Sequence, residues 1–278
     1  MTTNACTTGI GIDIGSRTTK IVRIRGGAII DAVVFDTGHD PVSEIERTAR
    51  GFGDETVVAT GYGRRLAEKR LTCRTVTEIR ACARGAKHLS PRCTGAIDIG
   101  GQDTKALEIK SGGGFGRFEM NDRCAAGTGR FLEVMAKTLG YEIEEFGGEA
   151  LRADFPAQVN SMCTVFAESE VVSMITRGEN RERIALGLHI ATARRVASMA
   201  SRLELGERIL FAGGVANNPC IVAALRDEMA GVIEVPDRPE LVVALGAALI
   251  GIEDVVGSDK ERCGEVSGAD RVLADRIR

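Results

Sequence analysis

A nine-residue pattern occurs twice in this chain. Residues 12–20 read IDIGSRTTK and residues 97–105 read IDIGGQDTK, and each copy continues into an apolar run. The two copies align from the first Ile to the last Lys without a gap, which favours an internal duplication over chance similarity. We therefore expect two related lobes, each opening with the same unit.

Each copy predicts a β-hairpin made of an apolar strand, an Asp, a glycine turn carrying hydroxyls, and a second strand. Such a tip is rich in free backbone N–H groups, which bind phosphates, and its glycines let an anion approach closely. Thr18 and Thr104 add hydroxyl donors, while Lys20 and Lys105 add positive charge. The Asp of each copy suits a hydrated Mg²⁺ better than a phosphate. The alternative is that two ordinary hairpins share common turn residues.

A third glycine site follows a predicted strand at 208–212, where Gly213 and Gly214 open a turn that leads through Asn217 to a helix. This turn could hold an adenosine, although by itself it could equally be an ordinary strand-to-helix connection. The chain has neither a Walker motif nor a G-x-G-x-x-G motif opening a βαβ unit. The order of the three sites resembles the actin, Hsp70 and sugar kinase ATPase superfamily. That resemblance implies an α/β fold of two duplicated ribonuclease H-like lobes that clamp ATP.

The composition indicates a soluble protein with sizeable cores. The chain has 278 residues, 44% of them hydrophobic, and no long uncharged apolar run, so we expect no membrane segment. No secretory signal is visible at the start of the sequence, so the cytoplasm is the expected location. The net charge is −3, with two Tyr and no Trp, which argues against a nucleic-acid partner. The three His residues show no ligand spacing and are expected to be structural.

The chain has eight Cys, and none of them form a C-x-x-C pair. Six are expected to be buried small apolar residues: Cys6, Cys73, Cys82, Cys93, Cys220 and Cys263. Cys124 and Cys163 instead precede predicted helix starts, where free N–H groups would stabilise a thiolate. Two such thiolates are too few for a four-thiolate iron–sulfur cluster, whereas a two-fold dimer supplies four.

The runs NDRCAAGTGRFL, at residues 121–132, and CTVFAESE, at residues 163–170, resemble those of the activators of 2-hydroxyacyl-CoA dehydratases. The wider group includes ATP-binding subunits of benzoyl-CoA reductases, and the resemblance spans residues 9–255. It implies a homodimeric ATPase that holds one [4Fe-4S] cluster between subunits through Cys124 and Cys163. It also implies a ferredoxin or flavodoxin as electron donor, and an iron–sulfur dehydratase, reductase or double-cubane protein as acceptor.

The same hypothesis assigns roles within the nucleotide site. Asp13 and Asp98 hold Mg²⁺ through water, and Asp98 is the first choice for the group that positions the attacking water, followed by Gln102 and Glu168. Glu168 and Glu170 are otherwise expected to be first-turn helix carboxylates. The residues expected to contact ATP are Gly15, Ser16, Thr18, Lys20, Gly100, Gly101, Gln102 and Lys105 at the phosphates, with Gly213, Gly214 and Asn217 around the adenosine.

Lobe I is expected at residues 8–94 and lobe II at 95–239, since the second hairpin opens a new unit. A helix at 240–255, with Gly246 allowing a close crossing, should return to lobe I. A second helix is expected at 184–205 within lobe II. Residues 256–278 form a charged tail outside the family resemblance, interpreted as a mobile extension or terminal helix.

Two other functions remain open. The first is a cluster-free ATPase or phosphotransferase of the sugar kinase or Hsp70 kind, although the short segment at 106–160 has its clearest motif around Cys124. The second is an actin-like assembly protein, for which no complementary faces are predicted. The loop around Arg64 is interpreted as an ordinary turn near the cleft.

Overall fold

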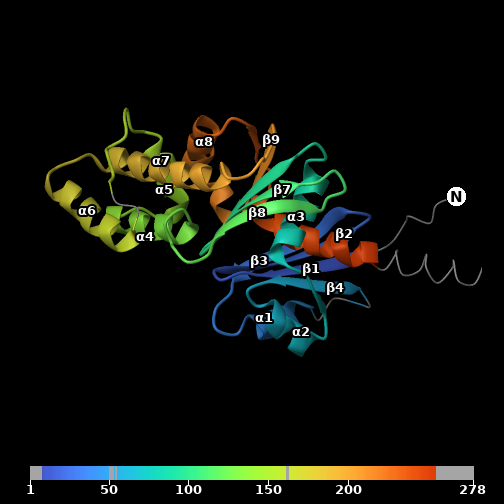
Figure 1. Ribbon diagram of the computed structural model, residues 1–278. Helices are drawn as coiled ribbons and strands as arrows, with labels where there is room; N and C mark the ends of the chain where they lie inside the picture. The colour runs from blue at the N-terminus through green and yellow to red at the C-terminus, as the bar shows by residue number, and fades with distance from the viewer. Residues whose placement is uncertain (1–7, 50–52, 54, 161–162, 255–278) are drawn as a thin grey trace, which may run out of the picture.

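Two five-stranded sheets with the same strand order form the framework of the protein (Figure 1). The computed structural model describes residues 8–49, 53, 55–160 and 163–254. The first sheet has the order β3-β2-β1-β4-β5, with β1 Thr8–Ile14, β2 Thr18–Arg25, β3 Ala28–Asp36, β4 Thr56–Gly61 and β5 Arg74–Thr75. The second has the order β8-β7-β6-β9-β10, with β6 Gly95–Ile99, β7 Thr104–Ile109, β8 Phe115–Asn121, β9 Arg208–Ala212 and β10 Val232–Glu234.

The predicted repeat forms equivalent antiparallel hairpins in the two sheets. In the first hairpin, β1–β2, Asp13 lies opposite Lys20, and in the second hairpin, β6–β7, Asp98 lies opposite Lys105. Parallel strands then join the other edges of β1 and β6, so that β4 and β9 occupy matching places. The duplication therefore covers the whole of each sheet.

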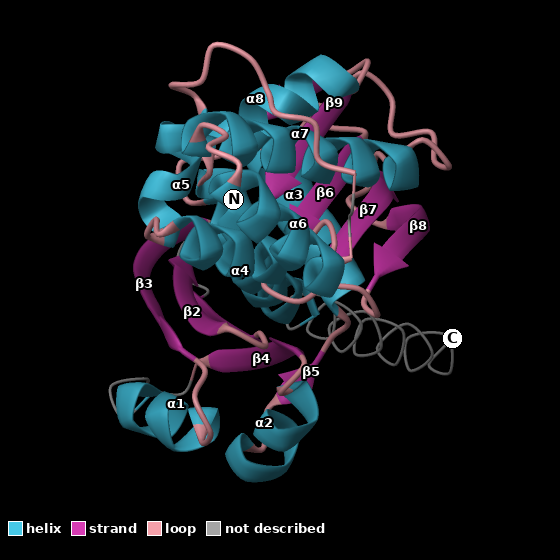
Figure 2. Ribbon diagram, turned by 90° about the vertical axis from the view of Figure 1, so that its left-hand side faces the viewer, coloured by secondary structure: helices cyan, strands magenta, loops and turns pink. Residues whose placement is uncertain are grey.

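Different residue types lie on the two faces of β1, because successive side chains in a strand point to opposite sides. Ile10, Ile12 and Ile14 lie in the core that includes residues of α1 Pro41–Ala49 and α2 Arg64–Leu71. Figure 2 shows both helices on the outer side of this sheet. On the other face, a Cβ added at Gly11 would lie 1.8 Å from the carbonyl oxygen of Ala244. A glycine there lets the helix at 242–254 lie directly against the strand, beside Asp13.

Each sheet is covered by a helix from the other half of the chain. The helix α3 Glu78–Leu89, within the range predicted for lobe I, contacts β6, β7, β8 and β9 of the second sheet. The helix at 242–254 packs its apolar residues on Val22 and Ile24 of the first sheet. The two helices cross where a Cβ at Gly246 would lie 1.8 Å from the carbonyl oxygen of Ala81. The close crossing expected at Gly246 is therefore present, against α3.

The remaining helices extend from the second sheet, at the left of Figure 1. The helix predicted at 184–205 is α7 Arg181–Ala200, so both of its ends lie earlier in the chain than predicted. It begins at Arg181 because the side chain of Asn180 accepts the N–H of Arg183 and caps the helix. Glu240 lies in the 3-10 turn Pro239–Leu241, ahead of the helix that was predicted to include it. The helices of this region are α4 Gly129–Leu139, α5 Ile143–Ala150, α6 Thr164–Thr176, α7 Arg181–Ala200 and α8 Pro219–Glu228.

The buried cysteines follow the prediction where the structure describes them. Cys73, Cys82, Cys93 and Cys220 are buried, and burial raises the pKa of each, that of Cys220 to about 12. The described residues do not include Cys6 or Cys263. They also leave out the last residue of the helix predicted at 240–255 and the predicted tail at 256–278. Within the described part, no helix combines the length and apolar character needed to cross a bilayer.

His189 is fully buried on α7 and has a structural role, as expected. Its Nδ1 donates to the carbonyl of Ala185 at 2.7 Å, and its Nε2 accepts from the side-chain amide of Asn218 at 3.0 Å. The ring also lies 4.5 Å from that of Phe146, measured between centroids. Burial lowers the pKa of His189 from 6.5 to about 4. A proton on Nε2 would therefore break the bond from Asn218.

This pKa predicts acid sensitivity. Between pH 6.5 and pH 4 the unfolded chain binds more protons at this site than the folded protein, so stability rises with pH and is lost as the pH falls. The shift corresponds to about 3 kcal/mol. Urea unfolding at several pH values should show a steeper loss in the wild type than in His189→Phe. His88→Gln, a substitution of an exposed His, should behave like the wild type. Parallel losses in wild type and His189→Phe would exclude His189 as the proton acceptor.

Candidate active site

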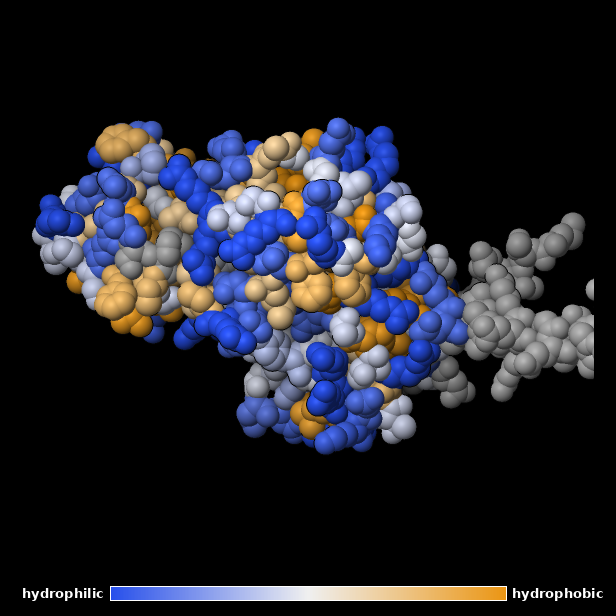
Figure 3. All heavy atoms as spheres, in the orientation of Figure 1, coloured by the Kyte–Doolittle hydropathy of each residue, from blue (hydrophilic) through white to orange (hydrophobic). Residues whose placement is uncertain are grey.

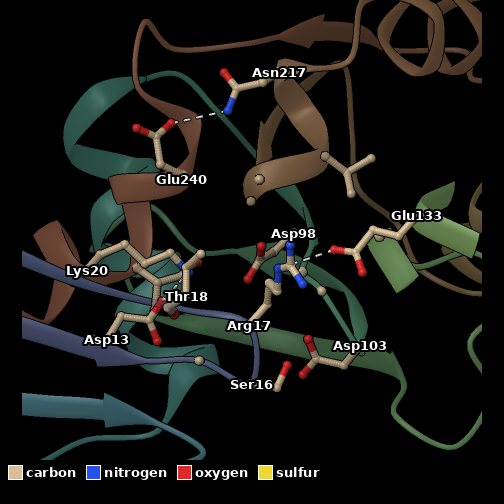
Figure 4. A pocket seen from close by; sticks show the side chains of 18 of the residues that line it. Asp13, Ser16, Arg17, Thr18, Lys20, Asp98, Asp103, Glu133, Asn217 and Glu240 are labelled. Atoms are coloured by element: carbon tan, nitrogen blue, oxygen red, sulfur yellow. Dashed lines mark hydrogen bonds and ion pairs between the residues drawn. The ribbon is translucent and has the colours of Figure 1, made fainter. Parts of the chain in front are cut away.

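A cavity of about 430 Å³ lies between the tips of the two hairpins (Figure 4). The structure brings together in its lining nearly all the residues predicted to contact ATP and Mg²⁺, including Gly213, Gly214 and Asn217 from the turn after β9. The predicted residues that line it are Asp13, Gly15, Ser16, Thr18, Lys20, Asp98, Gly100, Gly101, Lys105, Gly213, Gly214 and Asn217. The three glycine sites, far apart in sequence, therefore converge on one cavity.

The structure separates three predicted residues from this cavity. Gln102 is exposed at the second hairpin tip and is absent from the lining. Thr104 is buried and donates its hydroxyl to the carbonyl of Gly127 at 2.6 Å, so the prediction that it faces a phosphate is wrong. Glu168 lies beyond the first turn of α6 and lines a separate surface hollow. Glu170 lies further along α6 and accepts from the backbone and side chain of Asn160, so neither carboxylate is in the first turn.

The two hairpin tips have the same backbone design and touch each other. The N–H of Gly15 donates to the carbonyl of Thr18 at 3.2 Å, and the N–H of Gly100 donates to that of Asp103 at 2.9 Å. A Cβ at Gly101 would lie 2.9 Å from the Cβ of Arg17. A side chain at Gly101 would push the tips apart, which explains the glycine at this position.

An ion pair also joins the lobes across the cavity mouth. Arg17, from the first tip, lies with its Nε 3.5 Å from a carboxylate oxygen of Glu133 on α4 (Figure 4). Deeper in the cavity, the ammonium of Lys20 lies 3.3 Å from Asp13 and donates to the carbonyl of Thr18. Asp13 and Asp98 are 7% and 5% exposed. Both predicted Mg²⁺ carboxylates are therefore held largely out of water at the ends of the central strands.

The ammonium of Lys105 lies among carboxylates. Its Nζ is 2.7 Å from Glu78, 2.7 Å from Asp103 and 3.9 Å from Asp98. Burial alone would lower the pKa of Lys105, but the charges of these carboxylates raise it well above its ordinary value. Burial raises the pKa of Asp98 and of Glu78, while Lys105 opposes both shifts. Lys105 therefore compensates the charge of three acids, a role that the sequence did not predict.

Removing this cation should destabilise the fold. Lys105→Met leaves buried carboxylates without their partner, which costs about 3–5 kcal/mol at neutral pH. Acids whose pKa is raised in the folded state lose stability as pH rises, so the deficit should shrink toward pH 5 as Glu78 and Asp98 take up protons. Urea midpoints at two pH values test this. Lys20→Met, at a pair with one carboxylate, is the matched control and should cost less. Equal losses in both variants would contradict the cluster's role.

Several lining residues were not predicted. Asp103 aligns with Thr18 in the repeat, so comparing the two copies position by position could have found it. Glu78 comes from α3, which has no counterpart in the repeat pattern. Glu240 lies beside the turn after β9, where it accepts from Asn217 at 3.4 Å (Figure 4) and from Arg238 at 2.6 Å. Burial would raise the pKa of Glu240, but these hydrogen bonds, with that of its own backbone, bring it below its ordinary value.

The loop before Arg64 is the lobe I counterpart of the turn after β9. Gly61 is the last residue of β4 and Gly213 directly follows β9, and both have φ of +89°. A Cβ at Gly61 would lie 2.4 Å from the carbonyl oxygen of Ile14, and one at Gly213 would lie 2.3 Å from that of Ile99. Tyr62, next to Gly61, lines the cavity. The interpretation of this loop as an ordinary turn therefore missed part of the duplication.

Cys124 and Cys163 lie outside this cavity, each ahead of a helix. Cys124 is half-buried in the segment that leads into α4, and Cys163 is exposed at the N-cap of α6. The helices α4 and α6 pack on each other. Val165 and Phe166, in the first turn of α6, are each 69% exposed. Figure 3 shows apolar side chains at this end of the helical region, at the left.

Known proteins share both the sequence and the shape of this chain. A family model described as the BadF/BadG/BcrA/BcrD ATPase family matches residues 10–251. The 2-hydroxyisocaproyl-CoA dehydratase activator of Clostridioides difficile is 39% identical over 91% of this chain and 97% of its own length. The solved structure of the activator of the 2-hydroxyisocaproyl-CoA dehydratase from Clostridium difficile with bound ADPNP matches with a TM-score of 0.83 and 37% identity, over 91% of this chain and 97% of that one.

More distant structures share the fold alone. A ROK family glucokinase from Streptomyces griseus, solved with glucose and AMPPNP, matches with a TM-score of 0.58 at 14% identity, over 87% of this chain and 98% of that one. Together with the two sheets of equal strand order, these matches confirm the predicted α/β fold of the actin, Hsp70 and sugar kinase superfamily.

Proposed function

This chain belongs to the BadF/BadG/BcrA/BcrD ATPase family, and from that membership we propose that it is an ATP-hydrolysing electron donor that activates a 2-hydroxyacyl-CoA dehydratase or a related reductase. The relative from Clostridioides difficile, named as such an activator, matches over nearly its whole length. The observation that carries the proposal is a nucleotide-sized cavity between duplicated hairpins, together with two accessible thiols ahead of packed helices.

In this proposal ATP lies between the lobes. Backbone N–H groups of the two tips hold the phosphates, and Gly213, Gly214 and Asn217 flank the adenosine. A hydrated Mg²⁺ fits the carboxylate oxygens of Asp13 and Asp98, which are hard ligands, and when bound it would offset phosphate charge. Asp98 holds the attacking water, because its largely buried carboxylate lines the cavity between the two tips and can accept a proton there.

The thiols fit an iron–sulfur cluster by their chemistry. Of the six Cys residues that the structure describes, Cys124 and Cys163 reach the surface, while the others are buried with raised pKa values. Two thiols from each of two chains supply the four ligands of one [4Fe-4S] cluster. When bound, such a cluster would supply one-electron chemistry between a ferredoxin or flavodoxin donor and the iron–sulfur acceptor, and the cytoplasm is the proposed location.

The proposed homodimer also accounts for the apolar end of α6. Val165 and Phe166 lie two and three residues after Cys163 and are mostly exposed in the single chain. A second copy placed around a shared cluster would cover these side chains, because they lie in the first turn of α6, next to its N-cap Cys163. Their burial would contribute to holding the two chains together.

The test is to purify the protein without oxygen and to measure iron, acid-labile sulfide, mass in solution, and the visible spectrum with and without MgATP. We expect a dimer with about four irons and a visible band that dithionite bleaches. A colourless protein that still hydrolyses ATP after cluster reconstitution would instead support a cluster-free ATPase or phosphotransferase of the sugar kinase or Hsp70 kind.

A further inference from the structure

The second hairpin tip binds the first backbone N–H groups of helix α4. The first N–H groups of a helix have no partner within it and are usually bound by a capping side chain. Thr128, at the N-cap of α4, makes no such bond and donates its hydroxyl to the carbonyl of Ala125. Instead, the N–H of Gly129 donates to the carbonyl of Gly100 at 2.9 Å, and that of Arg130 donates to Gly101 at 2.7 Å. The hairpin tip is therefore the cap of α4.

Thr104 adds a third bond between the hairpin and this segment. Its hydroxyl donates to the carbonyl of Gly127 at 2.6 Å, and Thr104 is 1% exposed. A Cβ at Gly129 would lie 3.0 Å from the carbonyl oxygen of Gly100 and 3.2 Å from Val215 of the adenosine turn. The start of α4 is thus pressed against both parts of the proposed nucleotide site.

The segment between Asn121 and α4 is closed by its own hydrogen bonds. The side-chain amide of Asn121 donates to the carbonyls of Cys124, at 2.8 Å, and of Ala126, at 2.9 Å. From α7, the Nε of Arg195 donates to the same carbonyl of Ala126 at 3.1 Å. These bonds leave the backbone of Cys124 little freedom to move independently of Gly127. A displacement of the second hairpin tip therefore also displaces the backbone of Cys124.

The first lobe repeats this arrangement without a cysteine. Thr19 aligns with Thr104, and its hydroxyl lies 3.1 Å from that of Thr37, just after β3. Thr37 in turn donates its hydroxyl to the carbonyl of Gly15 at 2.8 Å and its N–H to that of Arg17 at 2.9 Å. In both lobes the segment after the third strand is tied to the hairpin tip. In the second lobe that segment carries Cys124.

Cys163 is differently connected. Its carbonyl accepts the N–H of Ala167 within α6, which packs on α4 and α7. Across the described residues, no hydrogen bond joins Cys163 to either hairpin. The two thiols therefore differ in how directly they can respond to a nucleotide.

We infer that Cys124 is the nucleotide-linked thiol and that Thr104 is the positioning residue that links it to the second phosphate hairpin. The inference rests on the proposed function, since it needs a nucleotide at this hairpin. When phosphates bind the backbone of Gly100 and Gly101, the second hairpin tip shifts. The hydrogen bonds from this tip to the start of α4, and the bond from Thr104 to Gly127, shift with it. The change reaches Cys124 and leaves Cys163 in place.

The test measures the reactivity of the two thiols. The full chain is freed of iron by a chelator without oxygen, a step that spares the hydrophobic cores because none contains either cysteine. It is then pulsed with iodoacetamide, with and without Mg²⁺ and a non-hydrolysable ATP analogue, and modification is counted by peptide mass spectrometry. We expect the nucleotide to change the rate at Cys124 about fivefold or more, and that at Cys163 less than about twofold.

Three variants isolate the link. Thr104→Val should bind the nucleotide as the wild type does, measured by calorimetry, but should lose most of the response at Cys124. Thr104→Ser, which keeps the hydroxyl, should restore it. Thr192→Val removes another buried hydroxyl, whose bond goes to Leu188 within α7, and should leave the response unchanged.

The outcomes separate this inference from the proposed function. Equal responses at both thiols, or a full response in Thr104→Val, would overturn the inference while leaving the nucleotide site intact. A wild-type chain that binds no nucleotide would overturn the proposed function and, with it, the inference.

Discussion

Replacing Cys124 or Cys163 with serine is expected to abolish iron binding by the protein. In the proposed homodimer each single substitution removes two of the four thiolates, because both chains carry the change. The remaining pair cannot hold a [4Fe-4S] cluster against loss to solvent. Iron and acid-labile sulfide should therefore fall to background in either variant, and the visible band should vanish.

The fold of these variants should be intact, which makes the result interpretable. Both thiols lie outside the hydrophobic cores, at half-buried or exposed positions, so circular dichroism and basal ATP hydrolysis should stay near wild-type values. Cys73→Ala, at a buried thiol, is the matched control and should keep its iron. If the serine variants retain the wild-type iron content, the cluster is held elsewhere and the assignment of these two residues fails.

Asp98→Asn is expected to lower the rate of ATP hydrolysis by roughly 10²–10⁴-fold, the contribution of a positioned base. The amide keeps the size of the side chain but cannot take up the proton of the attacking water. Asp98 is buried at the end of β6, between the two tips, so bulk water cannot replace it as the proton acceptor. Binding of ADP should change little, because the proposed adenosine contacts lie in the turn after β9.

Steady-state hydrolysis and calorimetry with ADP provide the measurement. Gln102→Ala is the informative comparison, because Gln102 was the second choice for the same role and is exposed at the tip. It should keep most of the activity. A large loss in Gln102→Ala, with Asp98→Asn nearly as active as the wild type, would transfer the role from Asp98 to Gln102.

The sequence was sufficient for features that are local or repeated. The duplicated pattern predicted both hairpins, and the glycine pair after β9 predicted a turn that lines the same cavity. These predictions succeed because strand period and glycine turns are encoded within a few adjacent residues. The duplication also carried information that was not used. Asp103 aligns with Thr18 within the repeated pattern, and Gly61 corresponds to Gly213 in the structure.

The contacts between distant segments could not be predicted in this way. Glu78 reaches Lys105 because α3 covers the second sheet, and Thr104 turns to Gly127 because the strand buries its side chain. Neither partner is marked by a local pattern, so the sequence predicted a phosphate contact for Lys105 but none of its carboxylate partners. These carboxylates come from two parts of the chain.

The exchanged helices have a consequence for synthesis on the ribosome. The first sheet is complete in sequence by residue 75, yet the helix that covers its inner face lies at 242–254. During translation this face, which includes Gly9 and Gly11, stays uncovered until the helix at 242–254 has been made. The first sheet therefore exposes apolar side chains such as Val22 and Ile24 during that interval, and the two lobes can close on each other only after it.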